Sequence, residues 1–235
     1  QSCQTNLSNN IFYNGPRAHI NFNDQFGGGN IVQRNVIFNA VRETADHGPF
    51  NSWGRQPYIT TVRDGTKSIT PAVSEIRSNF IIGSYNTQEA IDNDDASEYF
   101  NTSLNFFTYG GGGLKSDFGG HDNHHSNNIY AYLTGSCFGA GDGFVANHQN
   151  AFYSNKCVMR APNTSYAGFD CSSVLPDLHD NEIYLPDGSD TFVMCGQPYI
   201  EWQKSSGADP RTRILSWPRS NPLVILDWAR DLLGI

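Results

Sequence analysis

Short apolar bursts flanked by asparagine recur along most of the chain. Each burst holds two to four apolar or aromatic residues, and polar residues separate one burst from the next. Such segments predict short β-strands joined by polar turns. The bursts lie at residues 11–13, 31–32, 36–38, 80–82, 106–107, 129–132, 151–153 and 182–184.

The bursts recur with a regular step. From Asn79 the steps to Asn105, Asn128, Asn155 and Asn181 are 26, 23, 27 and 26 residues. A step in the mid-twenties is typical of a parallel β-helix, in which each coil holds about three strands and buries its side chains by stacking on its neighbours. Asparagine suits the corners because it tolerates left-handed backbone geometry and can form amide ladders along the axis. A β-sandwich would show strict apolar–polar alternation instead.

The two ends of the chain differ. Residues 220–222 (Ser-Asn-Pro) form a helix start and Gly234 a helix stop, so we expect a helix over 223–233. Its apolar face would consist of Ile225, Trp228, Ala229, Leu232 and Leu233. With the loop-like residues 197–217, this helix is expected to cap the C-terminal end of the solenoid. The first residues show no cap, which predicts an upstream β-helix segment or another chain at that end.

One interruption breaks the step. Asn35 and Asn79 are 44 residues apart, nearly two coils, which predicts an insertion over about residues 42–76. The expected organisation is therefore β-helix coils over 1–196 and a C-terminal loop and capping helix over 197–235. Insertions on one face of a solenoid commonly build its binding surface.

Composition narrows the function. The net charge is −8, and no cluster of Lys and Arg is present, so nucleic acid is a poor ligand. No apolar run is long enough to span a membrane. Charged residues make up only 16% of the chain, whereas glycine, asparagine and aromatic residues are abundant. This mixture favours a β-rich extracellular protein.

Sequons and cysteines agree with secretion. Candidate glycosylation sites are Asn6, Asn101 and Asn163. Proximity in sequence favours two disulfides, which would leave Cys3 unpaired. Buried free thiols are the alternative. The favoured pairs are Cys137–Cys157 and Cys171–Cys195.

The chain resembles the right-handed parallel β-helix proteins of the pectin-lyase-like superfamily. The resemblance rests on the asparagine-flanked coils over about 10–184 and on two segments, Asp46–Tyr58 and Ile91–Ser97. A subset of these proteins more often has glycine in the place of Ala96. The resemblance implies an all-β solenoid. It also implies activity on polysaccharide, although the superfamily includes non-enzymatic surface and tail proteins.

Candidate chemistry gathers within the interruption and in the two coils after it. Crowded carboxylates can divide into a proton donor and a base, so the candidate catalytic residues are Asp92, Asp94, Asp95, Asp117 and Asp122. One step of 23–26 residues would place the two halves of this group on adjacent coils. Candidate substrate-binding residues are His47, Trp53, Arg55, Lys115 and His121. Solvated Asp-rich corners are the structural alternative, and the adjacent His124 and His125 do not by themselves define a zinc site.

Two functions follow from these patterns. The first is a secreted carbohydrate-active enzyme, a glycoside hydrolase rather than a lyase; a lyase would need a base and a cation such as calcium to neutralise a uronate. The second is a non-enzymatic glycoprotein of an extracellular coat or filament, in which stacked asparagines and aromatics would serve rigidity. Two carboxylates close together in one groove would favour the enzyme.

Overall fold

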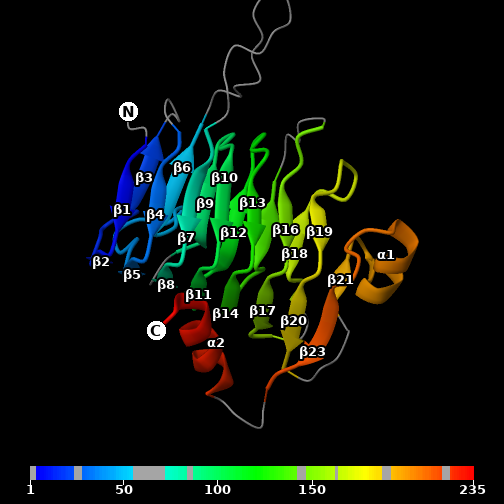
Figure 1. Ribbon diagram of the computed structural model, residues 1–235. Coiled ribbons are helices and arrows are strands. Elements are labelled where there is room, and N and C mark those ends of the chain that lie inside the picture. The colour runs from blue at the N-terminus through cyan, green and yellow to red at the C-terminus, as the bar shows by residue number, and fades with distance from the viewer. Residues whose placement is uncertain are drawn as a thin grey trace, which may run out of the picture.

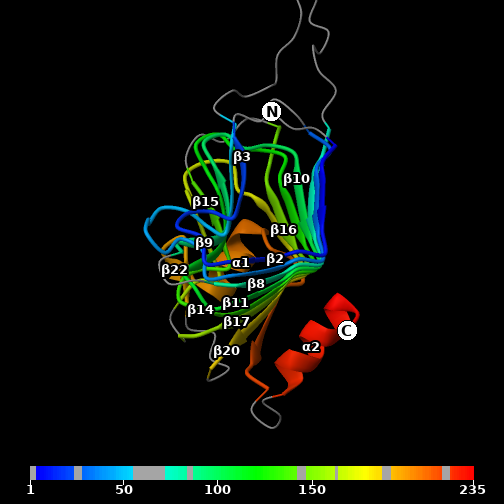
Figure 2. The ribbon, with the colours of Figure 1, turned by 90° about the vertical axis from the view of Figure 1, so that its left-hand side faces the viewer.

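The fold is a parallel β-solenoid of about six turns, seen from the side in Figure 1. The computed structural model describes residues 4–23, 28–54, 72–83, 87–141, 147–161, 164–186, 192–218 and 223–235. Each turn contributes one strand to each of three parallel sheets, which Figure 2 shows end-on from the N-terminal end. The predicted all-β solenoid is confirmed.

The three sheets are named A, B and C in the order in which the chain visits them. Sheet A consists of β1 (Asn6–Ser8), β4 (Ile31–Gln33), β7 (Ser74–Arg77), β10 (Phe100–Ser103), β13 (His124–Ser126), β16 (Ala151–Tyr153) and β19 (Asp177–His179). Sheet B consists of β2 (Ile11–Tyr13), β5 (Val36–Phe38), β8 (Phe80–Ile82), β11 (Phe106–Thr108), β14 (Ile129–Leu133), β17 (Lys156–Met159), β20 (Glu182–Leu185) and β23 (Arg213–Ser216). Sheet C consists of β3 (Ile20–Asn23), β6 (Phe50–Trp53), β9 (Glu89–Asp94), β12 (Gly112–Ser116), β15 (Phe138–Ala140) and β18 (Ala167–Phe169).

The core is a set of columns, because in-register parallel strands place equivalent side chains one above another. In sheet B one such column contains Ile81, Phe107, Tyr130, Cys157 and Ile183, all fully buried. The rings of Phe107 and Tyr130 stack with their centroids 4.8 Å apart. Apolar area buried between coils supplies the main driving force for folding, so no coil is expected to be stable alone.

The corner between sheets A and B is the most regular part of the molecule. Two residues make this corner in every coil, and the second of them is Asn from Asn10 to Asn181. Each ladder amide bonds to the next coil: Asn105 Oδ1 accepts from the backbone N–H of Asn79 at 2.9 Å, and Asn105 Nδ2 donates to Asn128 Oδ1 at 3.0 Å. The predicted amide ladder is therefore present.

The left-handed backbone of this corner belongs to the residue before each ladder asparagine. Arg34, Ser78 and Leu104 occupy it with φ of 53°, 54° and 58°. Asparagine is retained at the second position for its amide, which bonds both the neighbouring amide and a strand carbonyl, as Asn105 Nδ2 does with Ile76 O at 2.8 Å. The sequence pattern located the corner correctly, but the preference for asparagine there arises from hydrogen bonding.

The 44-residue step is one coil and not nearly two. The predicted insertion over 42–76 contains β6 and most of β7, and the extra length lies in the connection between them, residues 54–73. Of that connection, residues 55–71 lie outside the described part of the chain. The polar strand β6 gives little apolar signal, because only alternate side chains face the core.

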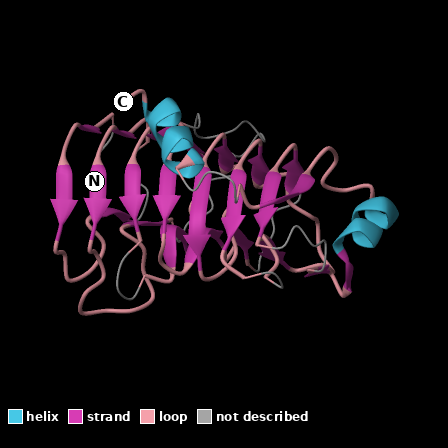
Figure 3. Ribbon diagram, turned by 90° about the horizontal axis from the view of Figure 1, so that it is seen from below, coloured by secondary structure: helices cyan, strands magenta, loops and turns pink. Residues whose placement is uncertain are grey.

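The C-terminal region contains two helices, α1 (Tyr199–Ser206) and α2 (Val224–Leu233). Residues 197–217 were expected to be a loop, but they form β22 (Gln197–Pro198), α1 and β23. Helix α1 covers the end of the stack, as Figure 3 shows, and buries Tyr199 and Trp202 against the core. The end cap is therefore α1, together with the hairpin of β21 (Val193–Met194) and β22.

Helix α2 confirms the predicted C-terminal helix but lies elsewhere. It runs along the outer face of sheet B, where Ile225 and Ala229 pack on outward side chains such as Phe106 and Ile129. Gly234 ends it in the left-handed conformation, as expected. The start predicted at 220–222 lies outside the described residues.

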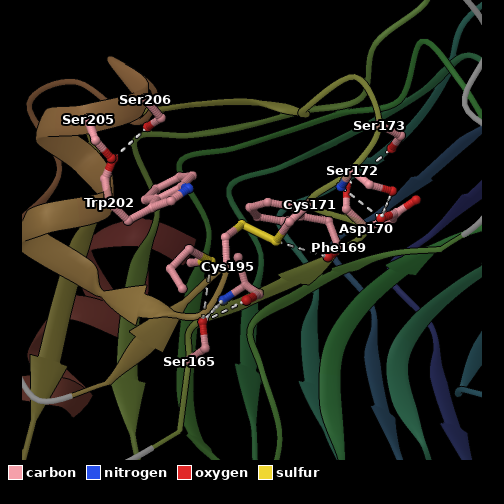
Figure 4. The surroundings of a disulfide bond; sticks show 12 residues. Ser165, Phe169, Asp170, Cys171, Ser172, Ser173, Cys195, Trp202, Ser205 and Ser206 are labelled. Atoms are coloured by element: carbon pink, nitrogen blue, oxygen red, sulfur yellow. Dashed lines mark hydrogen bonds between the residues drawn. A yellow bond between two sulfur atoms is a disulfide. The ribbon is translucent and has the colours of Figure 1, made fainter.

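One of the two predicted disulfides is present. Cys171–Cys195 joins the connection after β18 to the hairpin beside α1, and Figure 4 shows it next to Trp202. The predicted pair Cys137–Cys157 is wrong, since both are buried free thiols. The two thiols do meet in the core, where they hydrogen-bond without forming a disulfide, and Cys137 Sγ also contacts Met159 Sδ at 3.7 Å.

Candidate functional site

The outer face of sheet C carries a row of polar residues on three neighbouring strands. Asn51 of β6 pairs with Asp92 of β9, and Asp92 pairs with Lys115 of β12. The inward neighbours Ile91 and Leu114 belong to the core, so the alternation of the strands turns Asp92 and Lys115 outward. The predicted stacking of the two polar groups on adjacent coils is thus observed for these residues.

Lys115 is the centre of this cluster, which we call the Lys115 cluster: Lys115, Asp92, Asp94 and Asp117. Its Nζ lies 2.9 Å from Asp92 Oδ1, 3.0 Å from Asp94 Oδ1 and 3.4 Å from Asp117 Oδ2. Asp94 and Asp117 directly follow the paired residues Asn93 and Ser116, and therefore lie side by side at the carboxyl ends of their strands. One ammonium thus holds three carboxylates in a single group.

Buried polar contacts orient the cluster from below. Asn51 Nδ2 donates to Asp92 Oδ2 at 3.1 Å, and Ser52 Oγ donates to Asn93 Oδ1 at 3.1 Å. Ser97 Oγ donates to the carbonyl of Asp94 at 2.7 Å. The turn after β9 places Ala96 at φ 61°, a left-handed conformation that glycine adopts more easily. Sequence reasoning had not selected Asn51, although it lies within the Asp46–Tyr58 segment.

Burial raises the pKa values of three carboxyl groups at this site, Asp92, Asp117 and Glu89. Burial and the nearby Asp94 carboxylate raise the pKa of Asp117 to about 7, against the opposing effect of Lys115. Burial also raises the pKa of Asp92 to about 6. Glu89, at the start of β9, has its pKa raised to about 7 by burial and by Asp92. The carboxylates in turn raise the pKa of Lys115, so its ammonium stays charged.

Two of the expected substrate-binding residues lie beside the cluster. His47 Nδ1 is 3.8 Å from Asp92 Oδ2, and burial together with the charge of Arg17 lowers the pKa of His47. Trp53 pairs with Asp94 in the sheet, and the guanidinium of Arg17 lies 5.7 Å from its ring centroid. Arg17 was not foreseen. Arg55 lies outside the described residues.

Three other expected residues lie away from Lys115. Asp95 lies in the turn after β9, where its carbonyl accepts from Gly54 N–H at 2.9 Å. His121 and Asp122 belong to the corner between sheets C and A, and their side chains contact Glu98 and His148. Burial opposes a charge on His121, but hydrogen bonds to Glu98 and Asp122 raise its pKa. The expected single group of carboxylates is therefore two clusters.

A calcium ion was an expected cofactor for a lyase. The carboxylates of the Lys115 cluster already converge on an ammonium, so a calcium ion there would have to displace Lys115 from its ion pairs. The expected glycosylation sites are less central: Asn6 is exposed in β1, Asn101 is half-buried in β10, and Asn163 lies outside the described residues.

Comparisons with known proteins add no information to the fold. No family model, no curated protein and no solved structure matches this chain. The likeness to the pectin-lyase-like superfamily therefore rests on the sequence segments and on the parallel β-solenoid. Among the described residues, no helix has the length and apolar character needed to cross a membrane.

Proposed function

We propose that this chain is a secreted carbohydrate-active protein that hydrolyses a polysaccharide at the Lys115 cluster. The observation that carries the proposal is the convergence of three carboxyl groups on one lysine. Burial raises the pKa of one of them, Asp117, to about 7, which suits a proton donor. The Cys171–Cys195 disulfide and the sequons support an oxidising, extracellular location.

The solvent exposure of the three carboxyl groups decides which of them can contact a substrate. The Asp92 side chain is 0% exposed and cannot reach a sugar, whereas Asp94 is 20% and Asp117 13% exposed. Asp92 therefore holds Lys115 in place. Asp94 and Asp117 are the two carboxyls that a glycosidic bond can reach.

The contacts of this pair disfavour an inverting mechanism. Asp94 and Asp117 share the Lys115 Nζ and hydrogen-bond to each other, so their oxygens are closer than the roughly 6.5–9.5 Å that leaves room for a water in inverting enzymes, and we propose a retaining mechanism. Asp117 would protonate the glycosidic oxygen as its bond breaks, while Asp94 bonds to the anomeric carbon. Water, deprotonated by Asp117, would then displace Asp94 and restore both groups.

A lyase is less well supported. Elimination needs a base that abstracts a proton next to a uronate carboxyl. Lys115 is held in its charged form by three carboxylates, so it is a poor base. His47 is the remaining candidate base beside the cluster.

The test is a screen of the purified full chain against plant, algal and bacterial polysaccharides, with and without calcium. New reducing ends without ultraviolet absorbance from unsaturated product support hydrolysis. Asp117→Asn and Asp94→Asn should each lower the rate by about 10²–10⁴-fold. Asp177→Asn, an exposed carboxylate on sheet A, is the matched control. Unsaturated product would contradict hydrolysis, and equal rates in all variants would remove the Lys115 cluster from the mechanism.

The second candidate is a non-enzymatic glycoprotein of an extracellular coat or filament. It is favoured by the amide ladder and the stacked rings of the core, such as Phe107 and Tyr130, which together form a rigid repeat. This function would be favoured if the folded protein released no product from any polysaccharide in the screen and associated with increasing concentration in sedimentation experiments.

A further inference from the structure

A second cluster of ligand-type side chains lies at the corner between sheets C and A. Glu98 and His121 pair across two successive coils. His148 stands two residues before Asn150, as His121 stands two residues before Asn123, and the N–H of Asn123 bonds to Asn150 Oδ1 at 3.1 Å. Stacking of the coils thus places Glu98, His121 and His148 in one column.

Two imidazoles of this corner converge on one carboxylate oxygen. Asp122 Oδ2 lies 2.8 Å from His121 Nδ1 and 2.6 Å from His148 Nδ1. One potential ligand atom from each residue lies within 4.8 Å of the others. The atoms therefore surround a common point to which two nitrogens and one oxygen can all be directed.

The far side of His121 also faces a carboxylate. His121 Nε2 lies 3.1 Å from Glu98 Oε2, and the side chains of His121 and Glu98 are only 0% and 2% exposed. A neutral imidazole has one N–H, so it can donate to only one of its two carboxylate neighbours. If Nε2–H donates to Glu98, the lone pair of Nδ1 faces Asp122, and either a second proton on the ring or a bound cation between Nδ1 and Asp122 removes this repulsion.

A carboxylate behind a histidine is a recurrent feature of metal sites. It fixes the tautomer and ring orientation, leaving the other nitrogen free to bind the metal. Glu98 and Asp122 together carry two negative charges, which match a divalent cation. The Asp122 and His148 side chains are 25% and 23% exposed, so the common point can be reached from solvent.

We propose that His121, Asp122 and His148 bind a zinc-type divalent cation, with Glu98 orienting His121 from behind. Two imidazole nitrogens and one carboxylate oxygen suit Zn²⁺, which commonly takes three protein ligands and one water. Calcium prefers six to eight oxygen ligands and fits poorly. Tetrahedral Zn²⁺ needs ligand atoms about 3.3 Å apart, so the metal would move Asp122 Oδ2 away from the imidazole nitrogens by about 0.5–0.7 Å.

The cation would join two successive coils at this edge and leave one coordination position for water or a substrate oxygen. This inference is independent of the proposed hydrolysis, because it concerns different side chains and a direct binding measurement. The adjacent pair His124 and His125 is not part of it: His125 is buried in the core, and burial lowers its pKa to about 3.

The test uses the full chain without a histidine tag, stripped with a chelator and titrated with Zn²⁺ by calorimetry. We expect one Zn²⁺ per chain and, with Co²⁺ as a probe, the intense visible absorption of a four-coordinate ion. His148→Ala and Asp122→Asn should weaken Zn²⁺ affinity more than about 100-fold, and Glu98→Gln by about 10–100-fold. Calcium in excess should not displace the Zn²⁺.

His179→Ala is the matched control, because His179 Nδ1 contacts Asp180 Oδ2 at 2.7 Å in a pair that lacks a second imidazole. This variant should keep full Zn²⁺ affinity. Because His148 is partly exposed, His148→Ala is expected to fold, which circular dichroism verifies. The proposal is overturned if the stripped chain binds no Zn²⁺, or if His148→Ala and Asp122→Asn bind it as tightly as the unaltered chain.

Discussion

The corner between sheets A and B and the outer face of sheet C are built from the same coils but follow opposite rules. At the corner, every coil uses two residues and an amide ladder that repeats from Asn10 to Asn181. On sheet C, Asn51, Asp92 and Lys115 occupy one register with three different side chains. The connections after sheet C also vary, from five residues after β9 to twenty after β6.

The two regions therefore have different roles: the corner stabilises the fold, and the outer face of sheet C carries the candidate site. A ladder of identical neutral amides satisfies its own hydrogen bonds at any pH, because amides do not titrate. The charge of a group of buried carboxyls around one ammonium changes with pH, and burying these carboxyls in their charged form destabilises the folded state. The regular corner can therefore support a charged site that would be unfavourable by itself, and four substitutions examine this division.

The largest effect is expected in the ladder. Asn105→Leu removes the acceptor of Asn79 N–H and the donor to Ile76 O, which leaves buried backbone groups unpaired. We expect a loss of about 3–5 kcal/mol in unfolding free energy, equal at pH 5 and pH 8. Denaturant unfolding measures it. Asn10→Ala, at the exposed end of the ladder, is the control and should lose less than about 1 kcal/mol; equal losses would mean that the ladder does not stabilise the coils.

The next effect is expected at Lys115. Lys115→Met leaves Asp92, Asp94 and Asp117 without their counter-charge, and the pKa values of Asp92 and Asp117 rise further. A raised folded-state pKa destabilises the fold as pH rises from the unfolded-state pKa to the folded-state pKa, so the loss should be about 2–4 kcal/mol at pH 8 and about 1 kcal/mol at pH 5.

The measurement is the difference in unfolding free energy between the variant and the unaltered chain at each pH. Taking the difference cancels the contribution of buried His125, which is common to both proteins. Lys156→Met, which breaks the Lys156–Glu182 ion pair on sheet B, is the control. If Lys115→Met lowered the unfolding free energy equally at both pH values, the packing of the lysine methylenes, and not its charge, would be what stabilises the site.

A smaller effect of opposite sign is expected at Asp117. Its pKa of about 7 means that the folded state prefers the protonated carboxyl, so ionisation lowers stability as pH rises from about 4 through 7. Asp117→Asn should therefore gain about 1 kcal/mol at pH 8 and roughly a third of that at pH 5. Thermal unfolding at both pH values tests this, with the exposed Asp177→Asn as control. A loss at pH 8 would mean that the ion pair with Lys115 outweighs burial.

The smallest effect is expected at the left-handed position of the corner. Arg34 is exposed with φ 53°, a conformation that glycine adopts more easily. Arg34→Gly should gain about 0.5 kcal/mol, after the entropy of glycine in the unfolded chain is subtracted. Asn9→Gly, at φ 59°, should gain less, because asparagine already tolerates this geometry. Comparing the two melting temperatures decides whether the corner is strained.

Much of the fold could be predicted because solenoid geometry is periodic. The apolar bursts marked the strands of sheet B and several of sheet A, and the 23-residue step placed Asp92 beside Lys115 and Asp94 beside Asp117. Sheet C was harder to detect. In β6, Phe50 and Ser52 face inward while Asn51 and Trp53 do not, so the strand has no apolar burst.

The two errors have different causes. Cys137 and Cys157 do meet in the core, as their proximity in sequence predicts, but their thiols stay unbonded. The carboxylates were assigned to one group because distance along the chain does not determine the sheet or corner to which a side chain belongs. Asp122 follows Asp117 by five residues, yet the turn between them directs Asp122 to His121 and His148. His148 carried no local signal at all.

The sequence by itself determined the solenoid, its step and the amide ladder, because these depend on a local pattern repeated once per coil. Only the tertiary structure decided which polar residues meet. Stacking brings together side chains one coil apart, and the length of each turn decides the face on which they emerge. The Lys115 cluster and the His121–Asp122–His148 cluster both arise in this way, from residues whose distances in sequence are similar but whose positions on the coil differ.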